Sequence, residues 1–509
     1  MIKSGEVISL FKKDFGTGII YGGVFALYCI IIVTATLYYS PWWGVVDDAH
    51  CLDVAAKFWK LPSIGSFCGM VKEEMVFGGR FRPIYQFWII SAYSVFRNFP
   101  VGVYLFMALA GLATLLVWGR MINEIFPASQ DKFFNLFVYP LSFFIFTPFW
   151  NNFMYITVLE KFVYFFSSFS LYFYIRAYKT GKAAYLGVSC IFIVLGMFGK
   201  ETGVALAGVY CAYSLLDMLI FHKNAKLSSI SLAGSASIIV GYFFLVRGIW
   251  TGPFSLAYKQ NFNIGAILNS LFVAPMMIKL PMAVSVIFLC AGIILILRRP
   301  NGSIRQEYLL FPFFLGAYLL ILSPMGFRNY YLAPIAPSMM LTIYPIYMFI
   351  GARSVVRRGA FQIVLIILIS LVLIFIIIPR ISKMGEIKKV VSAIASIQNK
   401  NLTTKFFIGP PFYETACMLQ LHTNAGIEYL ISGLIDENML QDKARNYIIF
   451  EDRCSSLEFH DVAIEDEVYH NDTWRIFSLT EAAGKSLVFK PVFDRNFMQR
   501  IKDWIKTLH

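Results

Sequence analysis

The chain has 509 residues, of which 58% are hydrophobic and only 15% are charged, and its mean hydropathy is +0.65. This composition excludes an ordinary soluble domain, and apolar runs near the ~20 residues that a helix needs to cross the hydrocarbon core indicate a polytopic membrane protein. The formal net charge of +14 does not indicate nucleic-acid binding. Most lysines and arginines lie at the ends of apolar runs, where basic residues set membrane topology.

Eleven apolar runs predict transmembrane helices. They cover Gly18–Tyr39, Pro100–Gly119, Phe133–Phe149, Val158–Ile175, Ala183–Phe198, Gly203–Phe221, Leu227–Val246, Pro281–Leu297, Leu309–Leu322, Leu332–Ile350 and Gln362–Ile378. The shorter apolar segment Ile84–Phe96 predicts an interfacial helix that leads into the second span.

The short basic clusters between the spans agree with a single orientation of the chain. With the N-terminus in the cytoplasm, the clusters on the cytoplasmic side are Arg120 with Lys132, Arg176 with Lys179 and Lys182, Lys223 with Lys226, Arg298 with Arg299 and Arg305, and Arg353 with Arg357 and Arg358. The loop between the first and second spans is then expected on the outer side. The segment after Arg380 is expected on the same side.

The composition changes near Arg380 and divides the chain into two predicted domains. Residues 1–380 are expected to form a transmembrane domain with a large first outer loop, 40–99. Residues 381–509 carry more charge and are expected to form a small extracytoplasmic α/β domain. Its strand-like runs are Lys405–Ile408, Tyr447–Phe450 and Trp474–Ser478. The predicted fold class is a polytopic α-helical membrane protein with about eleven transmembrane helices and this small C-terminal domain.

The first outer loop carries the polar residues that stand out most against the apolar background. Asp47 and Asp48 follow the first span, and His50 lies two residues further on. Arg80 and Arg82 lie at the other end of the loop. An isolated aspartate pair is more often a solvated turn, and charged residues at a membrane boundary are often anchors.

Further charged residues are expected on the same outer face. Lys200 and Glu201 lie at the outer end of the fifth span, and Arg328 lies at the outer end of the ninth. Glu160 lies at the outer end of the fourth span, where an interfacial ion pair with the adjacent Lys161 is the alternative. Together these residues predict an outward-facing cluster of acids beside fixed cations, which suits proton abstraction next to a bound anion.

Two cysteines share the first outer loop, at Cys51 and Cys68. Outside the cytoplasm such a pair can oxidise, and the spacing contains no CxxC pattern that would indicate a metal site. We predict a local disulfide between them, with two free thiols as the alternative.

Four short motifs in the outer loops carry a resemblance to a known superfamily. Asp-Asp-Ala-His (Asp47 to His50) follows the first span, and Arg-Pro-Ile-Tyr-Gln-Phe-Trp (Arg82 to Trp88) opens the interfacial helix. Gly-Lys-Glu-Thr-Gly begins at Gly199, and Arg-Asn-Tyr-Tyr-Leu-Ala-Pro begins at Arg328. This order resembles the GT-C membrane glycosyltransferases, in particular the protein O-mannosyltransferases and the lipid A aminoarabinose transferases. The resemblance covers the transmembrane part and not the C-terminal domain.

The chain also departs from the pattern of these families. Arg82 is followed by a single proline, Asp48 stands where relatives often carry Glu, and the loop Gly248–Lys279 contains no large inserted domain. The missing inserted domain argues against the eukaryotic O-mannosyltransferases and favours bacterial enzymes that decorate envelope glycans. The size, the basic N-terminus and the outer C-terminal domain resemble the phage-type O-antigen glucosyltransferases, which modify lipopolysaccharide. We therefore expect a bacterial inner-membrane protein with a cytoplasmic N-terminus and a periplasmic C-terminal domain.

The resemblance implies an inverting glycosyltransferase that moves a sugar from a polyprenyl-phosphate donor to an envelope glycan, lipid or protein. It places proton abstraction from the attacking hydroxyl on Asp47, with Asp48 orienting it or holding the acceptor. The residues expected to bind the donor phosphate are Arg80, Arg82, Lys200 and Arg328. The secondary candidates are His50, Glu160, Glu201 and Lys259.

No cofactor is expected, because the sequence lacks HExxH, zinc-type Cys-His spacing, P-loop and Gly-rich dinucleotide motifs. A divalent ion held by the two aspartates with Glu160 is the alternative. The competing function is a lipid or glycan transporter or flippase without covalent chemistry. Transporters place ionisable residues near the membrane midplane, whereas Asp217 is the main such residue within a span here and lies near a cytoplasmic end.

The charge pattern predicts that the first outer loop and the C-terminal domain lie on the same side of the membrane. Single cysteines placed at Ser63 and Ser455 in a cysteine-free background should both react with an impermeant maleimide added from the outer side. Labelling of one of them from the cytoplasm alone would contradict the eleven-span topology.

Overall fold

The computed structural model of the protein describes most of the helical part and the strands of the C-terminal part. The described residues are 4–41, 55, 58–78, 81–96, 99–127, 129, 131–145, 159–247, 276–298, 305–322, 335–400, 404–408, 426–429, 434–435, 446–451, 458–459, 462–470 and 474–481.

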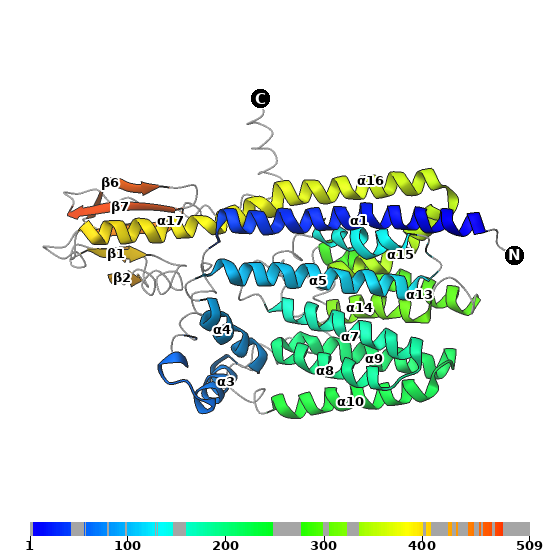
Figure 1. Cartoon of the computed structure of the whole chain (residues 1–509). Helices are drawn as coiled ribbons and strands as arrows, with labels where there is room; N and C mark the ends of the chain where they lie inside the picture. Colours follow the sequence, from blue (N-terminus) through cyan, green and yellow to red (C-terminus); the bar gives the residue numbers. More distant parts are fainter. Residues whose placement is uncertain are drawn as a thin grey trace. The chain divides into compact units, whose positions relative to one another are not determined.

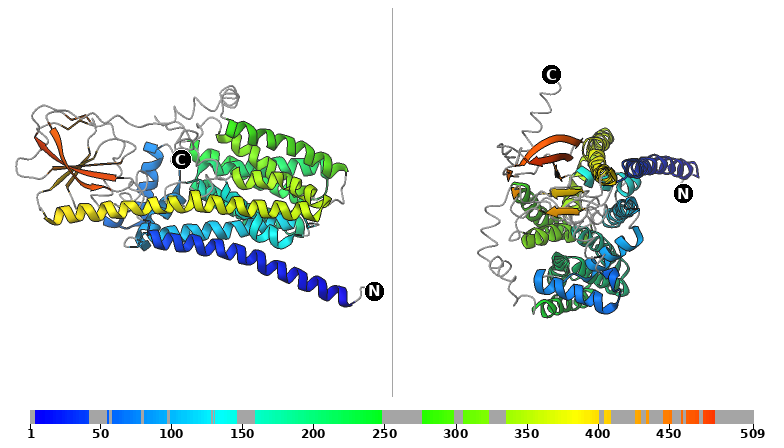
Figure 2. Two further views of the ribbon diagram at one scale, coloured as in Figure 1. Left: turned by 90° about the horizontal axis from the view of Figure 1, so that it is seen from above. Right: turned by 90° about the vertical axis from the view of Figure 1, so that its left-hand side faces the viewer.

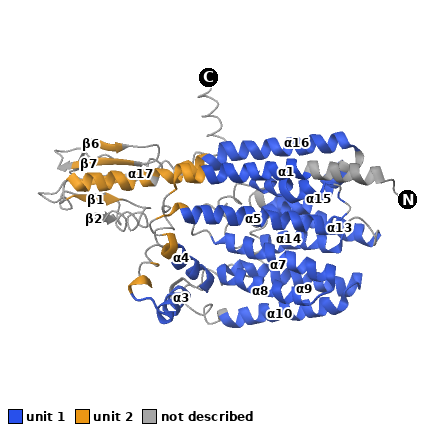
Figure 3. Ribbon diagram, viewed as in Figure 1, with its two compact units in different colours: residues 1–34, 61–92, 102–378 blue, residues 35–60, 93–101, 379–509 orange. Residues whose placement is uncertain are grey.

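The chain separates into two compact units (Figure 3). Unit 1 comprises residues 1–34, 61–92 and 102–378, and unit 2 comprises residues 35–60, 93–101 and 379–509. The domain boundary that we place at residue 380 from composition remains a prediction.

Unit 1 is built from helices that run roughly parallel, with α3 and α4 lying across one end of them (Figure 1). Figure 2 shows many of these helices end-on, packed side by side. The long helices are α1 (Ser4–Tyr39), α3 (Ile64–Gly78), α4 (Pro83–Phe96), α5 (Val101–Ile125), α7 (Glu160–Thr180), α8 (Ala184–Gly199), α9 (Val204–Leu216), α10 (Ala225–Arg247), α13 (Met276–Arg298), α14 (Leu310–Leu322), α15 (Ile335–Arg353) and α16 (Val355–Val372). Short π and 3₁₀ segments lie between or at the ends of them, at η1 (Phe134–Val138), η2 (Tyr139–Ile145), η3 (Glu201–Gly203), η4 (Asp217–Phe221), η5 (Gln306–Leu309) and η8 (Leu373–Ile377).

Every predicted span overlaps a helical element, and the interfacial helix predicted at Ile84–Phe96 is α4. Within the described residues, six helical stretches are long and apolar enough to cross a membrane. They are Gly18–Tyr39, Val101–Ile125, Glu201–Phe221, Ala225–Leu245, Lys279–Arg298 and Val355–Lys400. Shorter apolar helical stretches cover Phe134–Ile145, Ala184–Gly199 and Ala336–Ile350. The protein is thus a mostly helical, multi-pass membrane protein, and the number of eleven spans remains a prediction.

Large aromatic side chains fill the space between the helices of unit 1. Trp118 of α5 is buried and stacks on Tyr164 of α7 with ring centroids 6.1 Å apart. Its ring also contacts Phe143, edge-on at 6.0 Å, and Phe311 at 6.1 Å. One tryptophan therefore joins segments that are almost 200 residues apart in the sequence, and such aromatic pairs stabilise packing beyond the area that they bury.

Neutral hydroxyl groups make the polar contacts between α7, α9 and α10. The hydroxyl of Tyr174 lies 3.2 Å from that of Tyr178, 3.2 Å from Ser214 Oγ and 2.9 Å from Ser231 Oγ. Nearby, Ser170 Oγ lies 2.9 Å from the hydroxyl of Tyr210. Hydrogen bonds of this kind hold membrane helices together without the cost of burying a charge.

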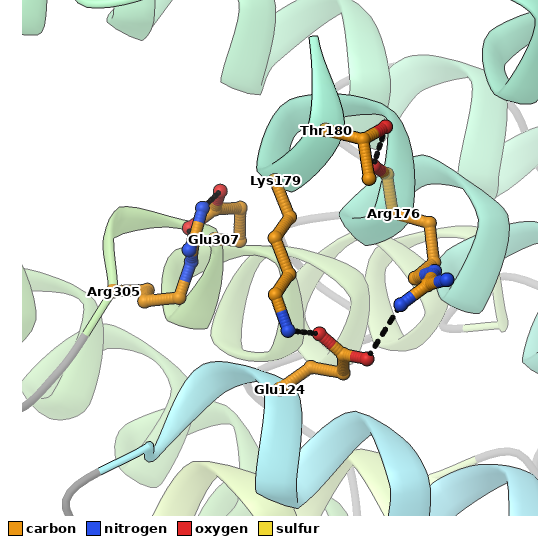
Figure 4. Close-up of polar contacts among 6 residues, drawn as sticks. All are labelled: Glu124, Arg176, Lys179, Thr180, Arg305 and Glu307. Atoms are coloured by element: carbon orange, nitrogen blue, oxygen red, sulfur yellow. Dashed lines mark hydrogen bonds and ion pairs between the residues drawn. The ribbon is translucent and has the colours of Figure 1, made fainter. Parts of the chain in front are cut away.

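Charged residues from three helix ends meet at one end of unit 1 (Figure 4). Glu124, near the end of α5, forms ion pairs with Arg176 and Lys179, one turn apart near the end of α7. Arg305 donates to Glu307 in η5, the segment before α14, and its backbone N–H donates to Ile125 O at 3.2 Å. The structure thus brings basic residues of two predicted cytoplasmic clusters to the same end of the bundle.

Unit 2 contains α17 (Ile378–Lys400), which ends beside a mixed sheet in Figures 1 and 2. The strands are β1 (Lys405–Ile408), β2 (Gly426–Tyr429), β3 (Leu434–Ile435), β4 (Asn446–Glu451), β5 (Glu458–Phe459), β6 (Val462–His470) and β7 (Trp474–Glu481). The five-stranded sheet has the order β2-β1-β4-β7-β6. β1 pairs in parallel with β2 and β4, whereas β7 is antiparallel to β4 and β6. The three strand-like runs of the sequence are confirmed as β1, β4 and β7.

The Cys51–Cys68 disulfide is not present in the structure. Cys68 lies on α3 as an exposed, free thiol, and Cys51 lies outside the described residues. The thiol of Cys68 needs no partner to satisfy it, because an S–H group forms only weak hydrogen bonds.

Close packing between α5 and η1 at Gly119 makes the stability of the protein sensitive to substitution at this position. A Cβ at this position of α5 would lie 2.7 Å from Leu136 Cα, so Gly119→Ala forces the helix and η1 apart. We expect a loss of about 1–3 kcal/mol, measured as a lower melting temperature in detergent. Gly208→Ala in α9 is the control, because a Cβ there meets no atom within 4 Å. Equal melting temperatures for the two variants would contradict the packing.

Candidate active site

The candidate site lies where α4 begins, α7 begins and α8 ends. α4 begins at Pro83, which suits a first helical position because its missing N–H needs no acceptor there. The first helical hydrogen bond, 3.2 Å long, runs from Gln86 N to Arg82 O. The side chain of Arg82 is therefore fixed at the N-terminal end of a helix, one turn before that of Gln86.

Arg82 is buried against an acid of a different helix, one that no sequence motif indicates. Its Nη2 forms an ion pair with Oε1 of Glu74 on α3, and the side chains are 9% and 12% exposed. The second oxygen of Glu74 accepts a hydrogen bond of 2.8 Å from Gln86 Nε2. The guanidinium also lies over the ring of Tyr85, 5.0 Å from its centroid. The positive charge of Arg82 is thus balanced within the protein by the carboxylate of Glu74.

Glu160 and Lys200 form a second, deeper ion pair. Lys200 Nζ lies 3.3 Å from Glu160 Oε1, and the two side chains are 5% and 1% exposed. Glu160 occupies the first turn of α7, where a negative charge is favoured by the helix dipole. Lys200 follows the last residue of α8, and its extended backbone, with φ −156°, ends the helix there.

Glycines allow close packing around this pair, between α8 and α7 at Gly199 and between η3 and α8 at Gly203. A Cβ on Gly199 would lie 2.5 Å from Cβ of Phe162, and a Cβ on Gly203 would lie 2.9 Å from the carbonyl carbon of Gly196. Any larger residue at either position would push the segments apart. The glycines of the Gly-Lys-Glu-Thr-Gly motif therefore have a packing role around the charged residues between them.

Lys161 is a third buried cation of this region. Its Nζ lies 3.4 Å from Sδ of Met107, 5.5 Å from the centroid of the Trp88 ring and 5.8 Å from that of Phe162. Ring faces attract a cation electrostatically, and the attraction is stronger where water is excluded. The ammonium is thus held between α4, α5 and α7.

Aromatic contacts bring the two ion pairs to the same region. Phe81, next to Arg82, meets Phe198 near the end of α8 edge-on, with centroids 5.5 Å apart. Trp88 of α4 meets Phe162 of α7 at 6.3 Å. The segment that leads into α4 therefore lies against α8, and α4 itself lies against α7. Arg82 and Lys200 are each paired with an acid in this region.

Of the predicted site residues, the structure describes Arg82, Lys200, Glu160 and Glu201. It brings Glu160 and Lys200 together, whereas Arg82 is paired with Glu74, and Glu201 is half-buried in η3. The predicted residues outside the described part of the chain are Asp47, Asp48, His50, Arg80, Lys259 and Arg328. Among described residues, no group of three or more His, Cys, Asp or Glu could hold a metal ion.

Two residues that contribute to the site, Gln86 and Glu74, were not predicted from the sequence. Gln86 lies four residues after Arg82, so both side chains share a helix face, and this spacing could have identified it. Glu74 gave no comparable signal, because it lies on another helix and meets Arg82 only through the turn between α3 and α4.

Comparisons with known proteins find no matching family model and no matching curated protein. Two solved structures are similar in fold. ArnT from Cupriavidus metallidurans, bound to undecaprenyl phosphate, has a TM-score of 0.47 at 12% identity, over 92% of this chain and 100% of ArnT. The Archaeoglobus fulgidus oligosaccharyltransferase, tethered to an acceptor peptide, has a TM-score of 0.41 at 12% identity, over 85% of this chain and 69% of its own. At these values the likeness assigns no activity to this chain.

The burial of the Glu160–Lys200 pair predicts strongly coupled effects of mutation. Lys200→Met leaves the Glu160 carboxylate buried without its cation, and should cost about 3–5 kcal/mol of stability. Glu160→Gln combined with Lys200→Met should recover much of that loss. Thermal unfolding of the two single variants and the double variant measures the coupling.

Lys182→Met, at an exposed lysine before α8, is the control and should change stability by no more than about 0.5 kcal/mol. Additive losses in the double variant would contradict the ion pair.

Proposed function

We propose that the protein is an inverting glycosyltransferase that moves a sugar from a polyprenyl-phosphate donor to an acceptor of the cell envelope. The observation that carries the proposal is the gathering of buried Arg82, Glu160, Lys161 and Lys200 where α4, α7 and α8 meet. Buried charges are costly among membrane helices and are usually retained for function. The sequence adds the acidic loop of Asp47 and Asp48, which begins a few residues after α1 ends.

The reaction transfers the sugar in one displacement. The acceptor hydroxyl attacks the anomeric carbon, the bond from that carbon to the phosphate oxygen breaks, and polyprenyl phosphate leaves with the electron pair. Asp47 takes the hydroxyl proton as general base, and Asp48 orients Asp47 or holds the acceptor. No further reactant is needed, because the donor is already activated.

The cations of the site stabilise the departing phosphate. Its negative charge grows as the sugar leaves, so a cation that contacts it binds the transition state more tightly than the donor. Lys200 offers three hydrogen-bond donors and Arg82 offers five, so each has the donors that contact with a phosphate oxygen requires. We assign the same role to Arg80 and Arg328, while His50, Glu201 and Lys259 remain secondary candidates.

The setting that we propose is the outer face of a bacterial inner membrane, with residues 381–509 in the periplasm. An envelope glycan such as the O-antigen of lipopolysaccharide is the acceptor class that fits this setting. The hydrocarbon tail of the donor remains in the bilayer and holds the phosphate at the interface, where the loops after α1 and before α4 are expected.

A transporter or flippase is the competing function, and the positions of the buried charges disfavour it. In the described part of the chain, the buried charged residues are Arg82, Glu160, Lys161, Lys200, Asp217 and Glu307. Each lies at or near a helix end. Transporters place such residues near the bilayer midplane, on interrupted helices.

The proposed roles of Asp47 and Arg82 predict different kinetic effects. Asp47→Asn keeps the shape but cannot accept the proton, so turnover should fall at least ~100-fold while donor binding persists. Arg82→Ala should weaken both donor binding and turnover. Arg82→Lys should retain only part of the wild-type donor binding and turnover, because an ammonium cannot reproduce the two-pronged contact of a guanidinium. Donor binding and turnover are measured on purified, folded variants.

Asp53→Asn, in the same loop, is the control and should retain turnover. A folded Asp47→Asn protein with near-normal turnover would show that Asp47 is not the general base, and Asp48 and Glu160 would become the candidates for that role.

A further inference from the structure

Arg82 and Gln86 hold a carboxylate between them. Arg82 Nη2 contacts Glu74 Oε1, and Gln86 Nε2 donates to Glu74 Oε2 at 2.8 Å. Arg82 directly precedes α4 and Gln86 lies in its first turn, four residues later, while the acid belongs to α3. Two N–H groups aimed at the two oxygens of one anion form a small oxyanion cradle, which we define as Arg82 and Gln86.

The cradle has hydrogen-bonding capacity that Glu74 does not use. Among the described residues, Arg82 Nε and Gln86 Oε1 are buried and have no hydrogen-bond partner, and the two residues are only 8% and 7% exposed. An unsatisfied buried donor or acceptor costs about 1–3 kcal/mol. Arg82 Nε requires an acceptor, and Gln86 Oε1 requires a donor. A sugar phosphate provides both, in a phosphate oxygen and a sugar hydroxyl.

We propose that the cradle binds the phosphate of the lipid-linked sugar, and that Glu74 is its resident anion, which holds Arg82 and Gln86 in place and competes with the phosphate. This assignment rests on the proposed function for the identity of the ligand. Two anions on one guanidinium repel each other strongly where water is excluded, so the phosphate and Glu74 bind in competition.

The competition favours the reaction over ground-state binding. A sugar linked through a phosphodiester carries one negative charge, the same as the Glu74 carboxylate. The departing phosphate monoester gains a second charge, so it displaces Glu74 more effectively than the donor does. When the lipid phosphate leaves, Glu74 returns to the cradle and restores the ion pair with Arg82. Glu74 is therefore a positioning residue that contacts neither sugar nor acceptor.

The competition is tested by comparing Glu74→Gln with Glu73→Gln in the full-length purified protein. Glu73 is the preceding residue of α3 and is exposed, so this control removes the same charge from the same helix. The probes are undecaprenyl phosphate, undecaprenol and inorganic phosphate. Binding is measured by titration, and melting temperatures are recorded with and without each probe.

We expect Glu74→Gln to bind undecaprenyl phosphate about tenfold more tightly than the wild type, a coupling of ordinary size between competing ligands. Undecaprenol should bind all variants equally. Without phosphate, Glu74→Gln should melt at a lower temperature, because Arg82 lacks its counter-charge, and added phosphate should recover more of that loss than in the control. A merely structural glutamate would show the lower melting temperature without the gain in phosphate affinity.

Two further variants keep the test independent of how well Glu74→Gln folds. Gln86→Glu places a second carboxylate beside Arg82 and should weaken phosphate binding, opposite in sign to Glu74→Gln. In an Arg82→Ala background, Glu74→Gln should no longer increase phosphate affinity, because the cation for which the anions compete is missing.

The outcomes separate this inference from the proposed function. One outcome is that inorganic phosphate stabilises Glu74→Gln more than Glu73→Gln, but undecaprenyl phosphate binds no better than undecaprenol. This result would support phosphate binding by the cradle and would contradict a lipid-linked donor. If neither phosphate distinguishes Glu74→Gln from the control, or if Glu74→Gln binds phosphate more weakly, the competition is overturned. The Asp47→Asn turnover then tests the proposed function separately.

Discussion

A charge buried among membrane helices requires a counter-charge within reach, and this requirement organises the candidate site. Glu160 and Lys200 are almost fully buried and lie 3.3 Å apart across the junction of α7 and α8. Their approach depends on Gly199, which leaves room for Phe162. Removing either charge would leave the other in a medium of low dielectric constant, so pairing and helix packing stabilise each other.

The same requirement separates the polar groups of unit 1 into two kinds. Between the helices, serine and tyrosine hydroxyls such as those of Tyr174 and Ser231 form the interhelical contacts. At the helix ends, charged side chains form ion pairs, either partly exposed, as at Glu124, or deeply buried, as at Glu160. Burying a hydrogen-bonded hydroxyl costs less than burying a charge, and the buried charges of the described residues accordingly lie at or near helix ends.

Because its cations are paired with carboxylates, the site discriminates between ligands by their negative charge. Arg82 and Lys200 each contact a carboxylate, so a weakly charged ligand gains little by binding to them. An anion whose charge increases during the reaction gains more, because it can displace or outweigh the resident acid. This behaviour suits the departure of a lipid phosphate better than the static capture of one.

The sequence by itself determined the membrane class, the positions of the helices and three strands of the C-terminal sheet, because hydrophobic length and alternation are local properties of the chain. It also selected Glu160 and Lys200 individually, from their places at helix ends. Only the tertiary structure decided their pairing, since they are 40 positions apart and meet through the close approach of α7 and α8 at Gly199. It likewise decided that Arg82 meets Glu74, because no periodic pattern relates residues on two helices joined by a turn.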